Sequence, residues 1–262
     1  MRIDVAGSEV YAYTGTRPLD GALPTVVFVH GAGNDHSVWA LQSRYFAHHG
    51  WNVLAVDLPG HDRSGGEALP SVEALADWLP AVLDAAGIGK AALVGHSLGS
   101  LAALECAARH PGRVARIALL GPAAPMPVSD ALLDAAKRND HLACELITSW
   151  SYSPGKQLGG GQMPGVWLAG NAMRLLERTQ PGVLHADLLA CHRYAAGIDR
   201  ASQVRCPALV ILGARDIMAP PKNAAALVAA LADARVVTLP DCGHALMAEQ
   251  PDAVLDALRA FL

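Results

Sequence analysis

Short apolar runs rich in β-branched residues alternate along the chain with longer stretches rich in Ala and Leu. Six runs are apolar at successive positions, and a strand formed by any of them would bury both faces: residues 25–30, 52–57, 91–96, 114–121, 206–213 and 234–240. Such strands usually lie in a parallel sheet that helices cover on both sides. The stretches between them predict helices over 37–48, 71–86, 98–109, 221–231 and 249–262. The pattern therefore predicts a doubly wound α/β fold with a mostly parallel sheet.

Two segments depart from this alternation. Residues 3–15 have the form of two strands joined by a turn, which predicts an antiparallel edge to the sheet. From residue 122 to 202 no strand pattern occurs, and Pro/Gly-rich joints separate helical patterns. We therefore expect a core domain of residues 1–121 and 203–262, with a helical lid (cap) inserted as residues 122–202. The insertion begins and ends at the carboxyl side of the sheet, where open α/β folds bind ligands.

Composition narrows the class of protein. The 262 residues are 52% hydrophobic and 17% charged with a net charge of −4, as in a globular domain. Basic residues are scattered singly, so we predict no nucleic-acid or membrane partner. We find neither a signal peptide nor the roughly 18 apolar residues of a membrane span. Five dispersed cysteines, none in a Cys-x-x-Cys pair, argue against disulfides or a zinc site and favour a cytoplasmic location.

The stretch LVGHSLGS, residues 93–100, places Ser97 between a predicted strand and a predicted helix. Gly95 and Gly99 flank it at i−2 and i+2, the spacing of a nucleophile elbow, where larger side chains would collide with the strand and helix. The helix N-terminus then faces any negative charge that develops at the serine. An inert tight turn is the alternative. A serine hydroxyl reacts only when a base takes its proton, so the choice depends on the rest of the chain.

A base and an acid follow later in the sequence. His244 lies in a Gly-flanked loop between the last predicted strand and the last helix, from which it can reach Ser97. Asp216 follows the strand 206–213, whereas the loop after the preceding strand (LLGPAAP) contains no carboxylate. Asp57 precedes the elbow strand and is predicted to be a loop-fixing residue, and Asp241 is too close to His244 in sequence to face the imidazole. The order Ser, Asp, His is the one expected of this fold.

The loop FVHGAGNDHSVW, residues 28–39, is rich in small residues. We predict that the backbone N–H groups of Ala32 and Leu98 converge on a developing oxyanion. Removal of one such donor typically costs about 10²–10³ in rate. A plain turn is the alternative, and His30 is expected to be a structural hydrogen-bonding residue. The loop lacks the Gly-x-Gly-x-x-Gly spacing and the lysine of phosphate-binding loops, so we predict neither a metal nor an organic cofactor.

The predicted lid offers apolar side chains to a ligand. We predict that Trp150, Trp167 and Met126, together with Met218 beside the predicted acid, line a substrate pocket suited to an apolar acyl or alcohol group. Met163 belongs to the same apolar set. The alternative for each of these side chains is packing of the lid helices against one another and the core.

Together these motifs carry a family resemblance. HGAGNDHSVW, DLPGHDRSGG, GHSLGS, GARDIMAPPK and DCGHALMAEQP stand in an order and spacing that resemble the α/β-hydrolase family over essentially the full chain. The resemblance implies the serine-nucleophile, esterase-like branch with a helical lid, and a catalytic triad of Ser97, Asp216 and His244. Serine at position 97 argues against the branches with an aspartate nucleophile, the haloalkane dehalogenases and epoxide hydrolases. Asp62 stands where many relatives have glycine, and its role is left open.

The implied chemistry is acyl transfer through an acyl-enzyme. We predict a carboxylesterase acting on small to medium apolar esters, as a monomer or homodimer. Hydrolysis of a C–C bond or of a lactone is the alternative on the same fold; a C–C hydrolase would need an arginine for a substrate carboxylate, with Arg174, Arg178 and Arg193 as candidates. A non-catalytic ligand receptor is a third hypothesis, although such proteins usually show a broken triad or oxyanion loop.

Overall fold

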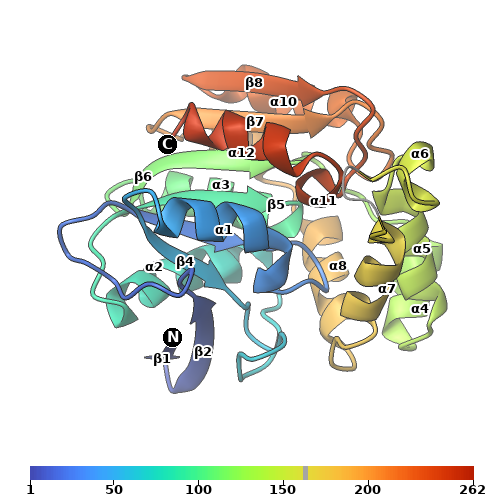
Figure 1. The fold of residues 1–262 in the computed structure, drawn as a ribbon, viewed down its shortest axis with the longest axis horizontal. Helices are drawn as coiled ribbons and strands as arrows, with labels where there is room; N and C mark the ends of the chain where they lie inside the picture. The colour runs from blue at the N-terminus through green and yellow to red at the C-terminus, as the bar shows by residue number, and fades with distance from the viewer. Residues whose placement is uncertain (162–164) are drawn as a thin grey trace.

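The computed structural model describes residues 1–161 and 165–262, in which eight strands form a single sheet of order β1-β2-β4-β3-β5-β6-β7-β8 (Figure 1). The strands are β1 (Arg2–Val5), β2 (Ser8–Tyr13), β3 (Thr25–Val29), β4 (Asn52–Val56), β5 (Ala91–His96), β6 (Val114–Leu120), β7 (Ala208–Gly213) and β8 (Ala234–Leu239). β1 and β2 are antiparallel, β2 pairs antiparallel with β4, and the pairs from β4 to β8 are parallel. The predicted α/β fold, with its antiparallel edge, is confirmed.

Helices cover both faces of this sheet (Figure 1). Those that connect the core strands are η1 (His36–Trp39), α1 (Ala40–Ala47), α2 (Val72–Ala85), α3 (Leu98–Arg109) and α10 (Pro221–Ala230), and α11 (Leu246–Glu249) and α12 (Pro251–Arg259) follow the last strand. One apolar cluster joins α2, α3 and α10 to the sheet, and a second joins α1 and α12 to the opposite face. Along β3, Val27 and Val29 belong to the first cluster and Val26 and Phe28 to the second. Successive side chains of a strand point to opposite faces, so both faces are buried, as the apolar runs predict.

Strand β8 differs from the expectation. Its sequence predicts burial on both faces, yet Arg235 and Val236 are exposed and only Leu239 is buried. β8 is the last strand of the sheet and pairs with β7 alone. At the edge of a sheet the helices no longer cover the faces fully, so apolar residues there stay in partial contact with solvent.

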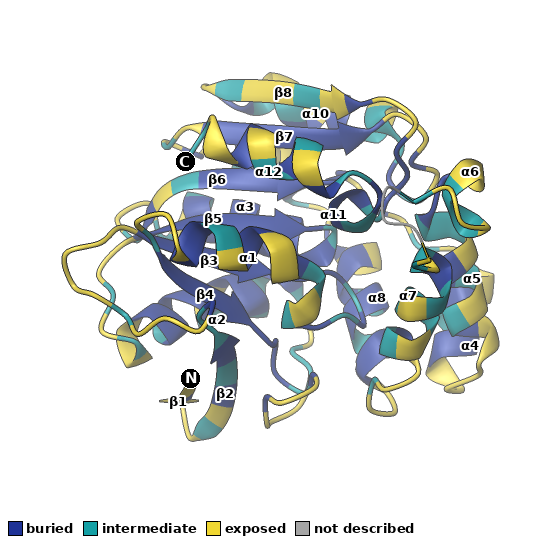
Figure 2. Ribbon diagram, viewed as in Figure 1, coloured by how far each residue is buried: buried dark blue, intermediate teal, exposed yellow. Residues whose placement is uncertain are grey.

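The segment between β6 and β7 consists of helices at the carboxyl ends of the parallel strands (Figure 1). They are α4 (Asp130–Lys137), α5 (Leu142–Ser151), α6 (Pro154–Gln157), α7 (Leu168–Leu176), α8 (Val183–Arg193) and α9 (Gly197–Ala201). α4, α5, α7 and α8 share an apolar cluster of their own. Figure 2 shows exposed residues on the outer sides of α4, α5 and α7 and buried ones along the sheet. Met163, one of the apolar residues expected in this segment, lies outside the described residues.

Both ends of this segment pack with the core. Ala123 and Ala124 at its start, and Tyr194 and Ala201 at its end, belong to the cluster formed with α2 and α3. The two ends also touch each other, because a Cβ added to Gly197 would lie 2.8 Å from the Cβ of Ala124. The chain therefore leaves and re-enters the core at one place. No helix in the described part of the chain combines the length and the apolar character that crossing a membrane requires.

Candidate active site

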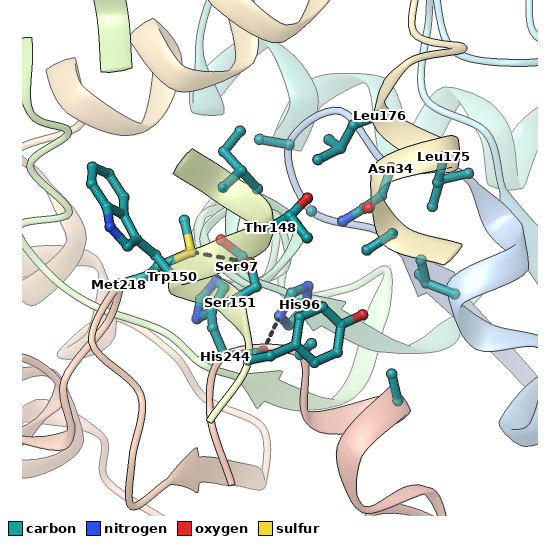
Figure 3. Close-up of a pocket in the computed structure, with 18 of the residues that line it drawn as sticks. Asn34, His96, Ser97, Thr148, Trp150, Ser151, Leu175, Leu176, Met218 and His244 are labelled. Carbon is teal, nitrogen blue, oxygen red and sulfur yellow. Dashed lines mark hydrogen bonds between the residues drawn. The ribbon is translucent and has the colours of Figure 1, made fainter. Parts of the chain in front are cut away.

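Ser97 occupies the sharp turn between β5 and α3. Its backbone has φ 52° and ψ −117°, a conformation that is rare for a residue with a side chain and typical of strained functional positions. The turn closes tightly, since a Cβ on Gly95 would lie 2.1 Å from the oxygen of Gly99, and one on Gly99 would lie 2.3 Å from the oxygen of Val29. Both flanking glycines are therefore required sterically. The turn directs the Ser97 side chain into a cavity (Figure 3).

Asp216 and His244 meet at the carboxyl ends of β7 and β8. The Nδ1 of His244 lies 2.7 Å from Oδ2 of Asp216, and both side chains are almost completely buried. Oδ1 of Asp216 accepts the N–H groups of Met218 and Ala219 at 2.9 and 2.8 Å, which fixes the carboxylate plane. Burial acts to raise the pKa of Asp216, but the adjacent His244 and the hydrogen bonds hold it below the usual value. Asp216 is therefore an ionised acceptor for the imidazole N–H.

The loop that carries His244 crosses the end of β7 in close contact. A Cβ on Gly213 would lie 2.2 Å from the oxygen of Gly243, so only glycine permits this crossing. A Cβ on Gly121, at the end of β6, would lie 3.2 Å from Nδ1 of His244. Gly121 directly follows β6, and the loop after it contains no carboxylate. Because glycine has no side chain, it leaves room here for the ring of His244. His244 and Ser97 both line the cavity (Figure 3).

The two carboxylates rejected on sequence grounds lie where they were expected. Asp57 accepts from the backbone N–H of His36 at 2.8 Å and pairs with its ring at 2.7 Å, which fixes the loop after β3. Asp241 has a side chain 82% exposed and pairs with Arg215. His30 is buried between Gly31, whose oxygen accepts from Nδ1, and the N–H of Leu58, which donates to Nε2.

The loop with the predicted oxyanion donors lies against the elbow. A Cβ added to Gly31 would lie 3.2 Å from the Cβ of Ser97, so the chain approaches the serine as closely as a residue without a side chain allows. Ala32 follows in this loop and lines the cavity, and Leu98 begins α3 directly after the serine. Within the described residues, neither the N–H of Ala32 nor that of Leu98 donates to a protein acceptor. Ala32 lines the cavity, whereas Leu98 is fully buried and is not among the described residues of the cavity wall.

The cavity has a volume of about 570 Å³ and extends from Ser97 and His244 to the helices between β6 and β7. Its wall is mainly apolar and includes Met126. Trp150 and Met218 also belong to this wall (Figure 3). Trp167 differs from the prediction: its ring lies over Gly170, it is 64% exposed, and among the described residues it is not part of the cavity wall. Its indole N–H donates to the oxygen of Gln157 at 3.0 Å, an orientation that sequence patterning does not encode.

Comparison with known proteins decides the family. Residues 26–257 match the Alpha/beta hydrolase family. This chain belongs to the α/β-hydrolase family. It is accordingly a hydrolytic enzyme, as the motifs predict.

Two proteins related to this α/β-hydrolase are named for different activities. It is 34% identical over 246 residues to the pimeloyl-[acyl-carrier protein] methyl ester esterase of Aromatoleum aromaticum, covering 87% of this chain and 94% of the relative. It is 26% identical over 243 residues to the 2-hydroxy-6-oxo-6-phenylhexa-2,4-dienoate hydrolase of Burkholderia cepacia, covering 87% and 84%. Among solved structures, the enol-lactonase from Burkholderia xenovorans LB400 shares the fold with a TM-score of 0.87 at 24% identity, over 100% of this chain and 99% of that one.

The structure of this α/β-hydrolase also explains the departure at Asp62. The residue has φ 37°, in the left-handed region that favours glycine. Its carboxylate accepts from Arg178, which follows α7. Arg174 lines the cavity as well but pairs with Glu177. Both arginines of the cavity wall are therefore already matched by carboxylates.

Two polar groupings near the site have no motif that predicts them. The buried carboxylate of Glu249 accepts the N–H of Gly243 at 2.9 Å and the hydroxyl of Ser153 at 2.5 Å, and so joins the His244 loop to the segment after α5. The second grouping pairs His61 with Asp187, from segments 126 residues apart. Neither could be found from spacing, because each joins distant parts of the chain through single side chains.

Proposed function

We propose that this α/β-hydrolase is a serine carboxylic-ester hydrolase acting on small to medium apolar esters, with Ser97, Asp216 and His244 as its catalytic triad. The observation that carries the proposal is the 2.7 Å contact of Asp216 with His244 Nδ1 beside a cavity into which Ser97 also projects. The contact keeps the proton on Nδ1, since the carboxylate accepts it, and leaves Nε2 unprotonated as a base.

In the proposed first step, Ser97 Oγ attacks the ester carbonyl carbon while His244 Nε2 takes the hydroxyl proton. The carbonyl π electrons move to oxygen, and the N–H groups of Ala32 and Leu98 stabilise the oxyanion. The tetrahedral adduct collapses as the imidazolium of His244 gives its proton to the leaving alcohol. Asp216 stabilises the imidazolium that forms when His244 takes the proton and that is lost when His244 gives the proton up.

In the proposed second step, water replaces the alcohol. His244 removes a proton from the water, the hydroxide oxygen bonds to the acyl carbon, and collapse of the second tetrahedral adduct returns the proton to Ser97 Oγ. One ester and one water are consumed, and one carboxylic acid and one alcohol are released. In both steps His244 is the group of the protein that takes up the proton and gives it back.

The substrate class follows from the cavity wall. Trp150, Met126 and Met218 present apolar surface close to Ser97, and a volume of about 570 Å³ is in the range of small-molecule sites. We propose that the helices of residues 122–202 act as the lid that forms this wall, and that the free cysteines reflect a reducing cytoplasm. The matched arginines favour an uncharged substrate over one with a free carboxylate.

The test is turnover of p-nitrophenyl acetate, butyrate and octanoate by the purified protein. We expect wild-type activity on at least one ester and a loss of about 10⁴-fold or more in kcat for Ser97→Ala. Ser202→Ala is the matched control, because the Ser202 hydroxyl bonds only to the oxygen of Asp199, away from the cavity. An alkyl phosphonate should label Ser97. A wild-type protein that binds esters without hydrolysing any of them would contradict the proposal and indicate a ligand receptor.

Hydrolysis of a C–C bond or a lactone is the second candidate. The observation in its favour is that Arg174 and Arg178 both line the cavity, where a guanidinium that exchanged its present partner, Glu177 or Asp62, for the ligand would hold a substrate carboxylate. Turnover of a 1,3-diketone acid or of a lactone faster than the p-nitrophenyl esters would select this candidate. The Ser97→Ala variant remains inactive in either case, since both reactions use the same nucleophile.

A further inference from the structure

A buried ionic contact joins the helices over the site to the core. Nε2 of His61, in the loop after β4, lies 2.9 Å from Oδ2 of Asp187 on α8. The two side chains are 2% and 4% exposed. The same Oδ2 accepts the backbone N–H of Gly33 at 2.9 Å. One carboxylate oxygen therefore binds both a core histidine and the loop that carries Ala32.

The contacts of both ring nitrogens of His61 favour the charged imidazolium. Nδ1 lies 3.0 Å from the carbonyl oxygen of Pro59, which can only accept, so Nδ1 bears a proton. Nε2 faces the carboxylate of Asp187 and donates as well. Burial acts to lower the pKa of His61, but Asp187 outweighs it and raises the pKa. The neighbouring His30, 4.9 Å away between ring centres, accepts at Nε2 and is neutral.

Contacts to its N–H group, its carbonyl oxygen and its Cα position hold Gly33 in place. Its N–H is bound by Asp187, and its carbonyl oxygen accepts the hydroxyl of Thr179 at 3.0 Å. Its φ is +64°, and a Cβ there would lie 2.9 Å from Cδ1 of Leu184 and 3.0 Å from Cδ2 of Leu176. All of these contacts come from the helical segment between β6 and β7. The orientation of the peptide that follows Ala32 is therefore set by this segment.

We infer that His61 and Asp187 form a latch that positions the oxyanion loop, so that the Ala32 N–H is aimed correctly only when the helices over the site are docked. The inference rests on the proposed function. This shared-oxygen contact acts through the charge of His61, because the imidazolium holds Oδ2 of Asp187 in the place where the N–H of Gly33 can reach it. His61 and Asp187 are positioning residues that do not line the cavity and do not contact the substrate.

The experiment compares Asp187→Asn, Asp187→Ala and His61→Gln with wild type. Asp187→Asn keeps an oxygen that can accept from Gly33 but loses the charge. For both Asp187 variants and for His61→Gln, we expect kcat for p-nitrophenyl butyrate to fall about 10- to 100-fold with KM within about twofold of wild type. Affinity for an alkyl boronic acid, which forms an anionic tetrahedral adduct at an activated serine, should fall by the same factor as kcat.

The matched control is Tyr194→Phe. Tyr194 Oη donates to the buried carboxylate of Glu105 on α3 at 2.7 Å, so this variant loses another buried contact between the same segment and the core. Tyr194 is not among the described residues that line the cavity, and its hydroxyl bonds to Glu105 rather than to the loop of Gly33. We expect it to lower thermal stability while kcat and boronic-acid affinity stay within twofold of wild type. An equal loss of kcat in Tyr194→Phe would overturn the latch and point to general loosening of the segment.

Two further readouts separate the latch from the proposed function. In ¹⁵N spectra at pH 7, both ring nitrogens of His61 should be protonated in wild type, and one should lose its proton in Asp187→Asn. A neutral His61 in wild type, or unchanged kcat and boronic-acid affinity in Asp187→Ala, would overturn the latch. Failure of wild type to hydrolyse any ester or to bind the boronic acid would instead overturn the proposed function, whatever the state of His61.

Discussion

The ring of His96 donates from Nε2 to the backbone oxygen of His244 at 2.8 Å, so the residue before the nucleophile holds the residue proposed as its base. The carbonyl can only accept, which places the proton on Nε2. Burial, followed by the proximity of His244, lowers the pKa of His96 to about 3. His96 is therefore neutral at any pH near neutrality. Its ring acts as a fixed strut between the elbow and the His244 loop.

Removing this strut should slow catalysis. We expect His96→Ala to lower kcat about 10- to 100-fold, because the His244 loop loses an anchor and a misplaced base is costly in rate. Steady-state hydrolysis of p-nitrophenyl butyrate measures the effect. His110→Ala is the control, since His110 pairs with Asp77 at the surface. Wild-type kcat in a well-folded His96→Ala protein would show that the contact is dispensable.

Asp216→Asn should abolish most activity without unfolding the protein. The amide oxygen of asparagine can still accept the N–H groups of Met218 and Ala219, but its NH₂ would face Nδ1 of His244 and select the wrong tautomer. A loss of about 10⁴-fold in kcat is expected from this effect. Asp241→Asn should retain wild-type activity, because that carboxylate is exposed and pairs with Arg215. If the two variants behaved alike, the assignment of the acid would be wrong.

Gly121→Ala tests the space beside the histidine ring. The added methyl group would lie 3.2 Å from His244, and Gly121 has φ +57°, so both the ring and the backbone are disturbed. We expect lower thermal stability and a kcat reduced about 10-fold or more. Gly87→Ala is a matched control, with φ +70° and open space around the added atom. It should share the loss of stability but keep kcat; a drop in kcat there as well would assign the effect to backbone strain alone.

The His61–Asp187 pair should make stability depend on pH. Asp187 raises the pKa of His61 above 6.5 in the folded protein, with burial opposing and Asp57 adding to the effect. The native state then holds a proton that the unfolded chain releases, so this contribution is complete below pH 6.5 and is lost as pH rises through the raised pKa. His30 faces the same ring but has a pKa of about 3 and does not titrate in this range.

Thermal unfolding from pH 6 to 9 measures this dependence. We expect the melting temperature of wild type to fall toward the alkaline end and that of Asp187→Asn to change less over the same range. Parallel curves for the two proteins would mean that His61 does not carry the proton.

Much of the fold is visible in the sequence because the sheet is buried on both faces. The runs that became β3, β4, β5, β6 and β7 are apolar at successive positions, and the elbow glycines on either side of Ser97 have a local steric cause. The exposure of Val236 in β8 was not predictable, because edge position is a property of strand order and not of composition.

The polar contacts around the site show the same limit. Asp216 and His244 were identifiable because each follows a strand end, and parallel strand ends converge. The partners of His61 and Glu249 come from the helical segment, where chain direction is set by packing between helices and not by a repeating pattern. Trp167 is not among the described residues of the cavity wall, and the hydrogen bond of its indole N–H to the oxygen of Gln157 is a contact that no repeating pattern encodes.

The contact between Ala124 and Gly197 gives the helical segment a narrow stem. Every residue of the proposed triad lies outside the helical segment. Much of the cavity wall, including Trp150, lies within that segment. Because insertions are tolerated where the two ends of a segment are close, helices of other lengths could be grafted onto this stem, provided that the contacts of Asp187 with Gly33 and of Ser153 with Glu249 are kept. The architecture thus allows the range of substrates to change through the helices that form the cavity wall, while the residues proposed for catalysis stay the same.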